Sequence, residues 1–393
     1  MKRILLLSPF ALLLFILPFP GTVALRLTCL ALAFLIALIS WHRLAPPALP
    51  CKAALGLWAA LALLSLAFAV DPAYSLGEIK NEIGYTMIAF IAFFVMSGDE
   101  RRAKGMLLAL AAGAFVLCAG ALASRFALGL WDQAGRYGGT GAFANYLAAV
   151  VPAVAVLGFY FDDGRLRHLS LALLGLLLVT GFFCLERIIW PVLFLQASVV
   201  LLFYRKQLGL SVIRIAGSLI VLALIASAVL AFTQATRFKE GSPLSAKMSN
   251  DVRLAFWPKV AGRIMEHPLT GAGFGRGVMN KAYPDLIPRE YPLLWHAHNV
   301  VLNYGLALGI PGMLVLLMVF GALLREYARL WQSDDQGLRL IGACGMVLVL
   351  GVFSCNMVND MFVRDVALLF WALNGMLLGL GRRQLAAGPR EAA

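Results

Sequence analysis

Residues 296–323 read HAHNVVLNYGLALGIPGMLVLLMVFGAL, two histidines followed by a hydrophobic stretch without a charged residue. A helix needs about 20 apolar residues to cross a bilayer, and this stretch supplies them. Comparable stretches lie along the whole chain. They predict an all-α polytopic membrane protein with about 12 transmembrane helices, at residues 4–20, 22–41, 53–70, 83–97, 105–124, 142–161, 168–184, 188–204, 212–232, 299–323, 337–357 and 365–381.

The composition agrees with a membrane protein. Of 393 residues, 61% are hydrophobic and only 13% are charged, which leaves too few polar side chains to cover a soluble domain. The net charge of +13 would suit nucleic acid, but the basic residues gather in alternate short loops, so we expect no nucleic-acid partner. These loops hold Lys2/Arg3, Arg43/Lys52, Arg101/Arg102/Lys104, Arg165/Arg167, Arg205/Lys206, Arg325/Arg329/Arg339 and Arg382/Arg383/Arg390.

The positive-inside rule places those loops in the cytoplasm. Both termini are then cytoplasmic, and the large loop lies on the outer side, which for a bacterial protein is the periplasm. We divide the chain into N-terminal transmembrane helices (1–232), one large periplasmic loop with short helices (233–297), and C-terminal transmembrane helices with a cytoplasmic tail (298–393). The Tyr74–Glu82 stretch is amphipathic, and we expect it to lie on the membrane surface.

The large loop carries nine basic residues although it faces the side that the orientation rule leaves uncharged. Because long loops cross the membrane regardless of charge, orientation does not explain these residues, and binding of an anion would. They are Arg237, Lys239, Lys247, Arg253, Lys259, Arg263, Arg276, Lys281 and Arg289.

Inside the loop, Ser249-Asn250-Asp251 offers N-cap residues for a helix that ends near His267-Pro268. Arg253 and Trp257 are four residues apart and share one face of this helix. The glycines at 271, 273 and 275 follow, and they allow close backbone approach to a bound ligand.

His298, which heads the span from 299 to 323, is a candidate general base because imidazole titrates near neutral pH. The alternative is a surface histidine at a helix start. His296 lies two residues earlier, and residues at this spacing do not face each other on a helix. We therefore expect neither a metal site shared by the two histidines nor joint action on one proton.

Arg187 lies between two predicted spans, at a depth where an arginine needs a partner. The partner is either Glu186 or a phosphate, which the guanidinium fork binds bidentately. Arg136 precedes a glycine-rich segment, and its partner could likewise be either a group within the protein or a phosphate. Together with Arg253 and His298, these arginines would form an anion cradle on the outer side.

Acidic pairs occur at 99–100, 162–163 and 334–335, all on the predicted cytoplasmic side. Metal-assisted handling of a diphosphate would require outward carboxylates. We therefore expect a site without a metal or other cofactor, in which arginines neutralise the phosphate charge.

These features resemble the O-antigen ligase and polymerase superfamily of bacterial inner-membrane glycosyltransferases. The twelve-span layout with one large loop covers nearly the whole chain. The motifs that carry the resemblance are Arg187 with Trp190, Arg253-x-x-x-Trp257, Pro268-Leu-x-Gly271-x-Gly273-x-Gly275, His298-Asn299-x-x-Leu302 and Gly309-x-x-Gly312. The segment Gly141–Asn145 lacks the Asn-Pro-Asn often present there, and Glu186 stands where a small residue is usual.

The resemblance implies a C-type glycosyltransferase-like fold and an inverting, metal-independent transfer from an undecaprenyl-diphosphate-linked glycan. In the ligase branch the acceptor is the lipid A-core of a Gram-negative bacterium. By position, His298 would be the general base, and Arg187 and Arg253 would hold the donor diphosphate. The remaining substrate-binding candidates are Arg136, Trp257, Gly273, Gly275, Arg276 and Asn299.

Three other functions stay open. An O-antigen polymerase would use a second carrier-linked repeat as acceptor, and a protein O-oligosaccharyltransferase would use a protein. A transporter for a lipid or an anion also carries intramembrane arginines, but it often has inverted repeats, which this sequence does not show. The candidate residues gather on one face, which favours the enzyme, and the short chain with one large loop favours the ligase. We expect membrane lipids to be its other partners.

Overall fold

The computed structural model describes residues 2–128, 139–184, 186–204, 211–239, 251–287, 294–360 and 362–387. Within those ranges the chain forms helices and turns and contains no strand, which confirms the all-α prediction. The elements are α1 (Lys2–Ile16), α2 (Val23–Leu44), α3 (Lys52–Leu64), η1 (Ser65–Phe68), α4 (Pro72–Glu78), η2 (Ile79–Gly84), α5 (Tyr85–Met96), α6 (Glu100–Leu128), α7 (Gly139–Phe159), α8 (Gly164–Cys184), α9 (Ile189–Tyr204), α10 (Val212–Lys239), α12 (Asp251–Ile264), α13 (Val278–Ala282), η3 (Pro284–Leu286), α14 (Val300–Trp331), α15 (Gln336–Asn356) and α16 (Arg364–Ala387).

Eight helices in the described part of the chain are long and apolar enough to cross a membrane, as expected of a polytopic membrane protein. Four shorter apolar helices occupy the other predicted spans, at Leu6–Ile16, Lys52–Phe68, Ile189–Tyr204 and Ala216–Val229. Every predicted span therefore coincides with an apolar helix. The count of twelve crossings is not confirmed, because these four are shorter than the length that defines a candidate span.

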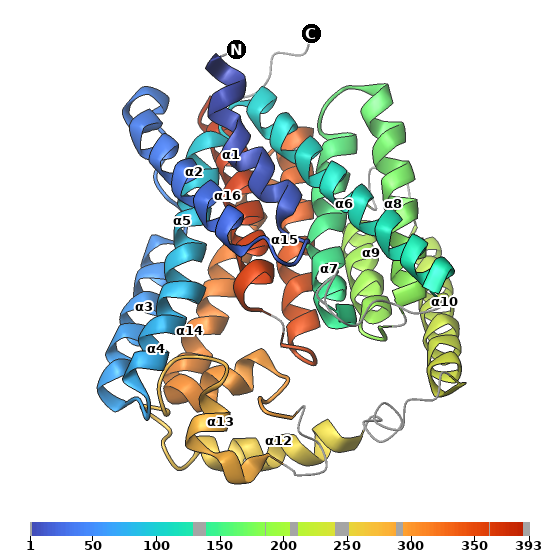
Figure 1. Ribbon diagram of the computed structural model, residues 1–393. Helices are drawn as coiled ribbons and strands as arrows, with labels where there is room; N and C mark the ends of the chain where they lie inside the picture. The colour runs from blue at the N-terminus through green and yellow to red at the C-terminus, as the bar shows by residue number, and fades with distance from the viewer. Residues whose placement is uncertain are drawn as a thin grey trace.

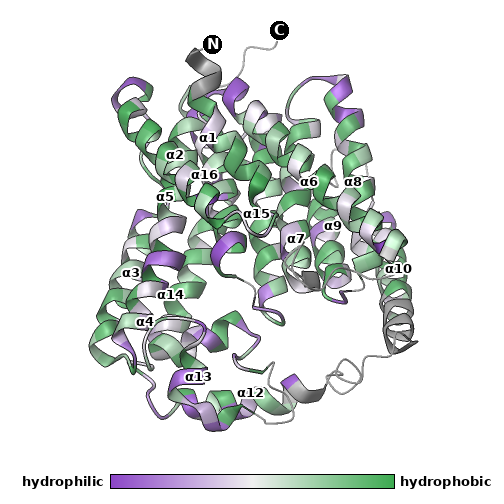
Figure 2. Cartoon of the chain, in the orientation of Figure 1, coloured by the Kyte–Doolittle hydropathy of each residue, from purple (hydrophilic) through white to green (hydrophobic). Residues whose placement is uncertain are grey.

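Those of the predicted basic loops that the structure describes gather at one end of the bundle. α1 begins and α16 ends at this end, whereas α12 and α13 lie at the opposite end (Figure 1). Side-chain contacts join the loops there: Lys104 Nζ lies 3.1 Å from the Asp163 carboxylate, and Arg383 Nη1 donates to the Ala45 carbonyl at 2.7 Å. Figure 2 shows apolar residues along the long helices and hydrophilic ones at α12 and α13.

The central contact of the bundle is between α16 and α5. Gly375 and Gly379 are one helical turn apart on α16, and each faces a carbonyl of α5, those of Phe90 and Phe94. Small residues at this spacing let two backbones approach closely, which drives helix association in lipid. A polar link, the Tyr327 hydroxyl donating to Asn374 Oδ1 at 2.9 Å, joins α14 to the same helix.

The Tyr74–Glu82 stretch does not form a separate surface helix as predicted. Asp71 caps α4 by accepting from the Tyr74 N–H at 2.9 Å, and α4 then continues through the π-helical turn η2 into α5. Ile79, Glu82 and Ile83 are buried. The π-helical turn shifts the register of the helix, so that Glu82 points into the protein rather than along its surface.

α14 is kinked at Gly309, whose φ is +69°, and the loop satisfies the backbone groups that the kink releases. Pro311 has no N–H, so the Ala307 carbonyl lacks its usual helical donor. The Gly273 N–H donates to that carbonyl at 3.0 Å. The Ala272 N–H donates to Leu306 O at 2.9 Å, and the Ile310 N–H donates to Pro268 O at 2.7 Å. The broken part of α14 is thereby paired with residues 268–273.

We expect Gly375→Ala to lower the stability of the protein, because the new methyl group would overlap the Phe90 carbonyl. Overpacking of this kind costs roughly 1–3 kcal/mol. Gly321→Ala is the matched control, since a methyl group at Gly321 meets no atom within 4 Å and alanine favours a helix. Thermal melting of the purified variants in detergent measures both. Equal melting temperatures for the two variants would contradict the packing argument.

Candidate functional site

The site is built around residues 295–299, here called the histidine turn. α14 begins only at Val300, with Asn299 as its cap: Asn299 Oδ1 accepts from the Leu302 N–H, and its Nδ2 donates to Met357 O, both at 3.0 Å. His298 therefore precedes the helix, and its φ is +52°. A left-handed conformation costs a non-glycine residue roughly 1–3 kcal/mol and persists only where its surroundings enforce it.

The two histidines face each other, so the prediction that they would not is wrong. The His298 N–H donates to His296 Nδ1 at 3.1 Å, and the ring centroids lie 3.9 Å apart with 34° between the planes. The prediction assumed helical geometry, whereas both residues lie in the turn before the helix. His296 therefore contacts His298 directly, through its ring and through the His298 N–H.

His296 is buried and remains neutral. Burial lowers its pKa to about 2, and the positive charges of His298, Arg276 and Arg253 act in the same direction. Those three groups therefore lie close enough to the imidazole to repel a proton on it. The fold thus concentrates positive charge around a histidine that does not itself ionise near neutral pH.

α12 brings Arg253 to the histidine turn. Phe256, Val260 and Ile264 are buried, and Trp257 Nε1 donates to the Ala297 carbonyl at 3.0 Å. α12 also contacts α14. The predicted helix and the shared face of Arg253 and Trp257 are therefore as expected. Trp257 contacts the backbone of the turn that carries His298.

Arg276 approaches the turn from the other end of the loop. Its Nη1 donates to the Asp360 carbonyl at 2.6 Å, and its guanidinium lies 4.8 Å from the centre of the Trp295 ring. Trp295 in turn contacts His296 edge-on, with ring centroids 4.5 Å apart. Arg276 thus connects the histidine turn with the segment between α15 and α16.

Asp360 belongs to the site and was missed in the sequence. It is buried, has a φ of +42° and accepts a hydrogen bond from Asn303 Nδ2. Its Oδ2 lies 3.8 Å from His296 Nδ1. Burial raises the pKa of Asp360 to about 7, although Arg276 acts to lower it. The only sequence signal was a single acidic residue in the short polar break between two spans.

Glu82 is a second carboxylate that the sequence reading assigned elsewhere. It lies close enough to Asp360 and Arg276 for their charges to interact, and Glu78 lies beside it. The end of the bundle that carries the histidine turn therefore holds carboxylates from η2, α4 and the α15–α16 connection. In the described part of the chain, no group of three His, Cys, Asp or Glu side chains has an arrangement that could hold a metal ion.

The glycine run lies against the protein itself. A side chain at Gly273 would meet Ala69 and Ser75, and one at Gly275 would meet Tyr74. The Tyr74 hydroxyl also accepts from the Gly277 N–H at 2.8 Å. The close approach that these glycines permit is therefore to α4 and the residues before it, and this contact positions Arg276 just behind the run.

Arg187 lies in the turn between α8 and α9 and is half-buried. The neighbouring Glu186 interacts electrostatically with Cys355 at the end of α15, so this turn is on the same end of the bundle as Asp360. Asn145 is buried and accepts from Asn356 Nδ2 at 2.6 Å, which ties α7 to α15. Arg136 lies outside the described residues.

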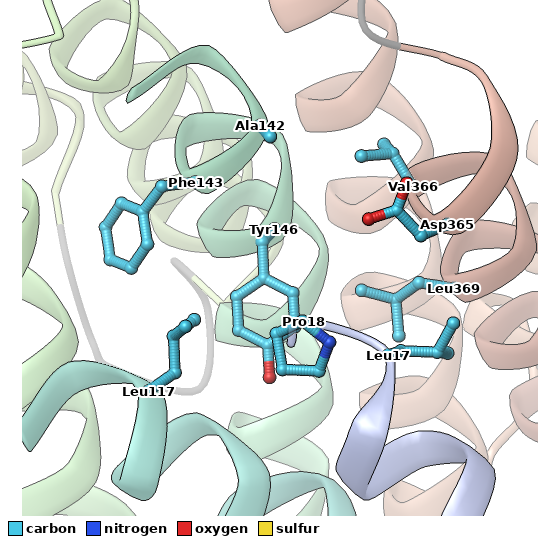
Figure 3. A pocket seen from close by; sticks show the side chains of 9 residues that line it. All are labelled: Leu17, Pro18, Leu117, Ala142, Phe143, Tyr146, Asp365, Val366 and Leu369. Atoms are coloured by element: carbon cyan, nitrogen blue, oxygen red, sulfur yellow. The ribbon is translucent and has the colours of Figure 1, made fainter. Parts of the chain in front are cut away.

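The pocket drawn in Figure 3 is separate from the histidine turn. It is formed where the end of α1 meets α6, α7 and α16, and it is lined by Leu17, Pro18, Leu117, Ala142, Phe143, Tyr146, Asp365, Val366 and Leu369. Asp365 lies 3.9 Å from Arg26. The candidate site residues do not line this pocket, whose walls are mostly apolar.

Comparison with known proteins gives one match. No curated protein matches this chain. Residues 172–317 match the family model described as O-antigen ligase. This segment runs from α8 into α14 and contains Arg187, Arg253, Arg276 and His298. The match supports the resemblance read from the motifs: residues 172–317 are similar to the O-antigen ligase family.

Proposed function

We propose that this protein is an O-antigen ligase of lipopolysaccharide biosynthesis. It would transfer a polysaccharide from undecaprenyl diphosphate to the lipid A-core on the periplasmic face of a bacterial inner membrane. The observation that carries the proposal is the convergence of Arg253, Arg276 and His298 around the buried His296, within a segment of the O-antigen ligase family. The site lies at the end of the bundle opposite the basic loops, which is the periplasmic end if those loops are cytoplasmic.

The positive cluster suits a diphosphate. Guanidinium groups bind phosphoryl oxygens bidentately and stay charged at any relevant pH. Arg253 and Arg187 would hold the donor diphosphate, with Arg276 and the N-cap residue Asn299 at the edge of the same site. Trp257, Gly273 and Gly275 would support binding indirectly, because they position the loop that carries the arginines.

The transfer itself is a single displacement. The acceptor hydroxyl attacks the anomeric carbon and passes its proton to His298 as the new glycosidic bond forms. The bond from the anomeric carbon to the diphosphate oxygen breaks on the opposite face, so the configuration inverts. Negative charge grows on the leaving diphosphate, and arginines fixed beside it stabilise that charge without reorganisation.

A deletion strain tests the assignment as a ligase. Because only the last transfer would be lost, we expect intact lipid A-core without long-chain polysaccharide and accumulation of the polymer on its carrier. Gel analysis of lipopolysaccharide and of extracted carrier lipids measures both, and the gene restored on a plasmid is the control. A core that carries one repeat would instead identify a polymerase, and a normal polysaccharide pattern would contradict both assignments.

Substitutions at the site should fail in different ways. His298→Ala should abolish transfer and leave donor binding nearly intact, because the proton moves only during the reaction. Arg253→Ala and Arg187→Ala should weaken donor binding and slow transfer by roughly 10²–10³-fold. Lysine should replace either arginine poorly, since a point charge cannot form the bidentate contact.

Arg263→Ala is the matched control on α12, because Arg263 pairs with Glu266 and Asp285 at the surface. Donor affinity and single-turnover transfer are measured for each purified variant. If His298→Ala lost donor binding but kept the transfer rate of bound donor, His298 would be a phosphate ligand and not the base.

The arginines should make a divalent cation unnecessary for the transfer. We expect purified protein in excess EDTA to keep its activity on carrier-linked donor, because Arg187 and Arg253 supply the charge that a metal would otherwise bring. Activity is compared with and without chelator, and after addition of magnesium or manganese. Loss in EDTA with recovery on adding metal would show that the charge-neutralising groups were misassigned.

A further inference from the structure

Asp360 is buried beneath the histidine turn and is not accessible to a substrate. Only 2% of the residue is exposed, and its carboxylate contacts Asn303 and lies near His296. A group so enclosed does not reach a polysaccharide or a lipid carrier. Any effect of Asp360 on the reaction is therefore exerted through the side chains around it.

One hydrogen-bonded route leads from the carboxylate to the backbone of the turn. Asn303 Nδ2 donates to Asp360 Oδ2, and Asn303 Oδ1 accepts from the Ala297 N–H at 2.9 Å. His296 Nδ1 lies 3.8 Å from the same Asp360 oxygen, but it accepts from the His298 N–H and so has no proton to donate to the carboxylate. The N–H of Ala297, the residue before His298, is thus held by an asparagine that itself contacts Asp360.

The carboxylate also places a negative charge near the positively charged groups around His296. Arg276 and Arg253 lie near His296 together with His298. An imidazole that accepts a proton there would add to this positive charge, and a nearby carboxylate favours the protonated form. Asp360 is thus suited both to fix the turn and to offset the charge that develops on it.

We propose that Asp360 is a positioning residue for His298, acting through Asn303 and through its negative charge, and that its carboxylate form is the active one. The inference rests on the proposed function, in which His298 is the general base. It makes the short connection between α15 and α16 part of the machinery, although this connection lies about 60 residues further along the chain.

The ionisation of Asp360 gives the proposal a distinct signature. The pKa of Asp360 is raised from 3.8 to about 7 by burial, against the opposing effect of Arg276. The other titratable groups around it are Glu82 on η2, Tyr304 on α14 and His296 in the turn. Above about pH 7 the carboxylate form dominates, and we expect activity to rise through this range.

The same shift predicts a cost in stability. Between pH 4 and 7 the folded protein holds a proton that the unfolded chain releases, so the free energy of unfolding falls as the pH rises and stays lower above pH 7. Asp360→Asn removes this ionisation, and its amide oxygen still accepts from Asn303. The variant should melt at a higher temperature than the wild type at about pH 8 and at the same temperature near pH 4.

The experiment combines kinetics and melting of the full-length protein in detergent. We expect Asp360→Asn to lower kcat by about a hundredfold and to leave the KM for donor unchanged. The variant removes the negative charge that favours a protonated His298, and a nearby opposite charge shifts a pKa by roughly 1–3 units. In the wild type, the acid limb of the pH–rate profile should be steeper than a single ionisation allows. In Asp360→Asn it should follow a single ionisation.

Asn303→Ala tests the same route from its other side. It should lower kcat similarly, but it should also lower the melting temperature at about pH 8, because it leaves the buried carboxylate without its donor. Glu82→Gln should keep the steep acid limb, and the exposed Asp285→Asn should behave as the wild type.

The outcomes separate the two proposals. A wild type without transferase activity would remove the proposed function. An active wild type with Asp360→Asn unchanged in kcat would overturn the role of Asp360 alone. A variant that lost stability and activity together at every pH would show a structural brace instead. If Asp360→Asn did not fold, Asn303→Ala with an unchanged kcat and acid limb would also overturn the proposal.

Discussion

The arrangement of the site depends on the backbone contact between the loop and the broken part of α14. A kink at Gly309 and the missing N–H of Pro311 release backbone groups, and water cannot satisfy them at membrane depth. The loop satisfies them: Ala272 and Gly273 donate to α14 carbonyls, and Pro268 accepts from it. Because this contact is backbone to backbone, it does not depend on particular side chains, and it fixes the residues that lie between Arg253 on α12 and Arg276.

The sequence predicted those features that depend on local pattern. Hydrophobic length located every apolar helix, because it is a property of neighbouring residues. The predicted cap residues Ser249 and Asn250 lie outside the described residues, although the helix expected after them is present as α12. The geometry of the histidines was mispredicted, since the left-handed φ of His298 comes from contacts with other segments. Asp360 and Glu82 were missed for a related reason. Each looks like an ordinary polar residue beside a span, and only packing between distant helices brings both to Arg276.

Several residues of the site have conformations or surroundings that are unfavourable for them individually. His298 and Asp360 both have positive φ angles, Asp360 is a buried acid, and Arg253 and Arg276 lie close to one imidazole. Each of these features costs stability when taken alone. Residues placed at such cost cluster at functional sites, because a packed surrounding can hold them in advance of the reaction.

The basic residues of the large loop fall into two groups in the structure. Some form surface ion pairs, and others lie beside the histidine turn. Arg263 pairs with Glu266 and Asp285, and Lys281 pairs with Asp71. These surface pairs contribute little to stability and help to keep the loop on the end of the bundle. Arg253 and Arg276 instead lie beside the histidine turn. Fewer basic residues therefore lie at the site than the loop contains. Those that reach it do so because of their positions, Arg253 on α12 and Arg276 after the glycine run.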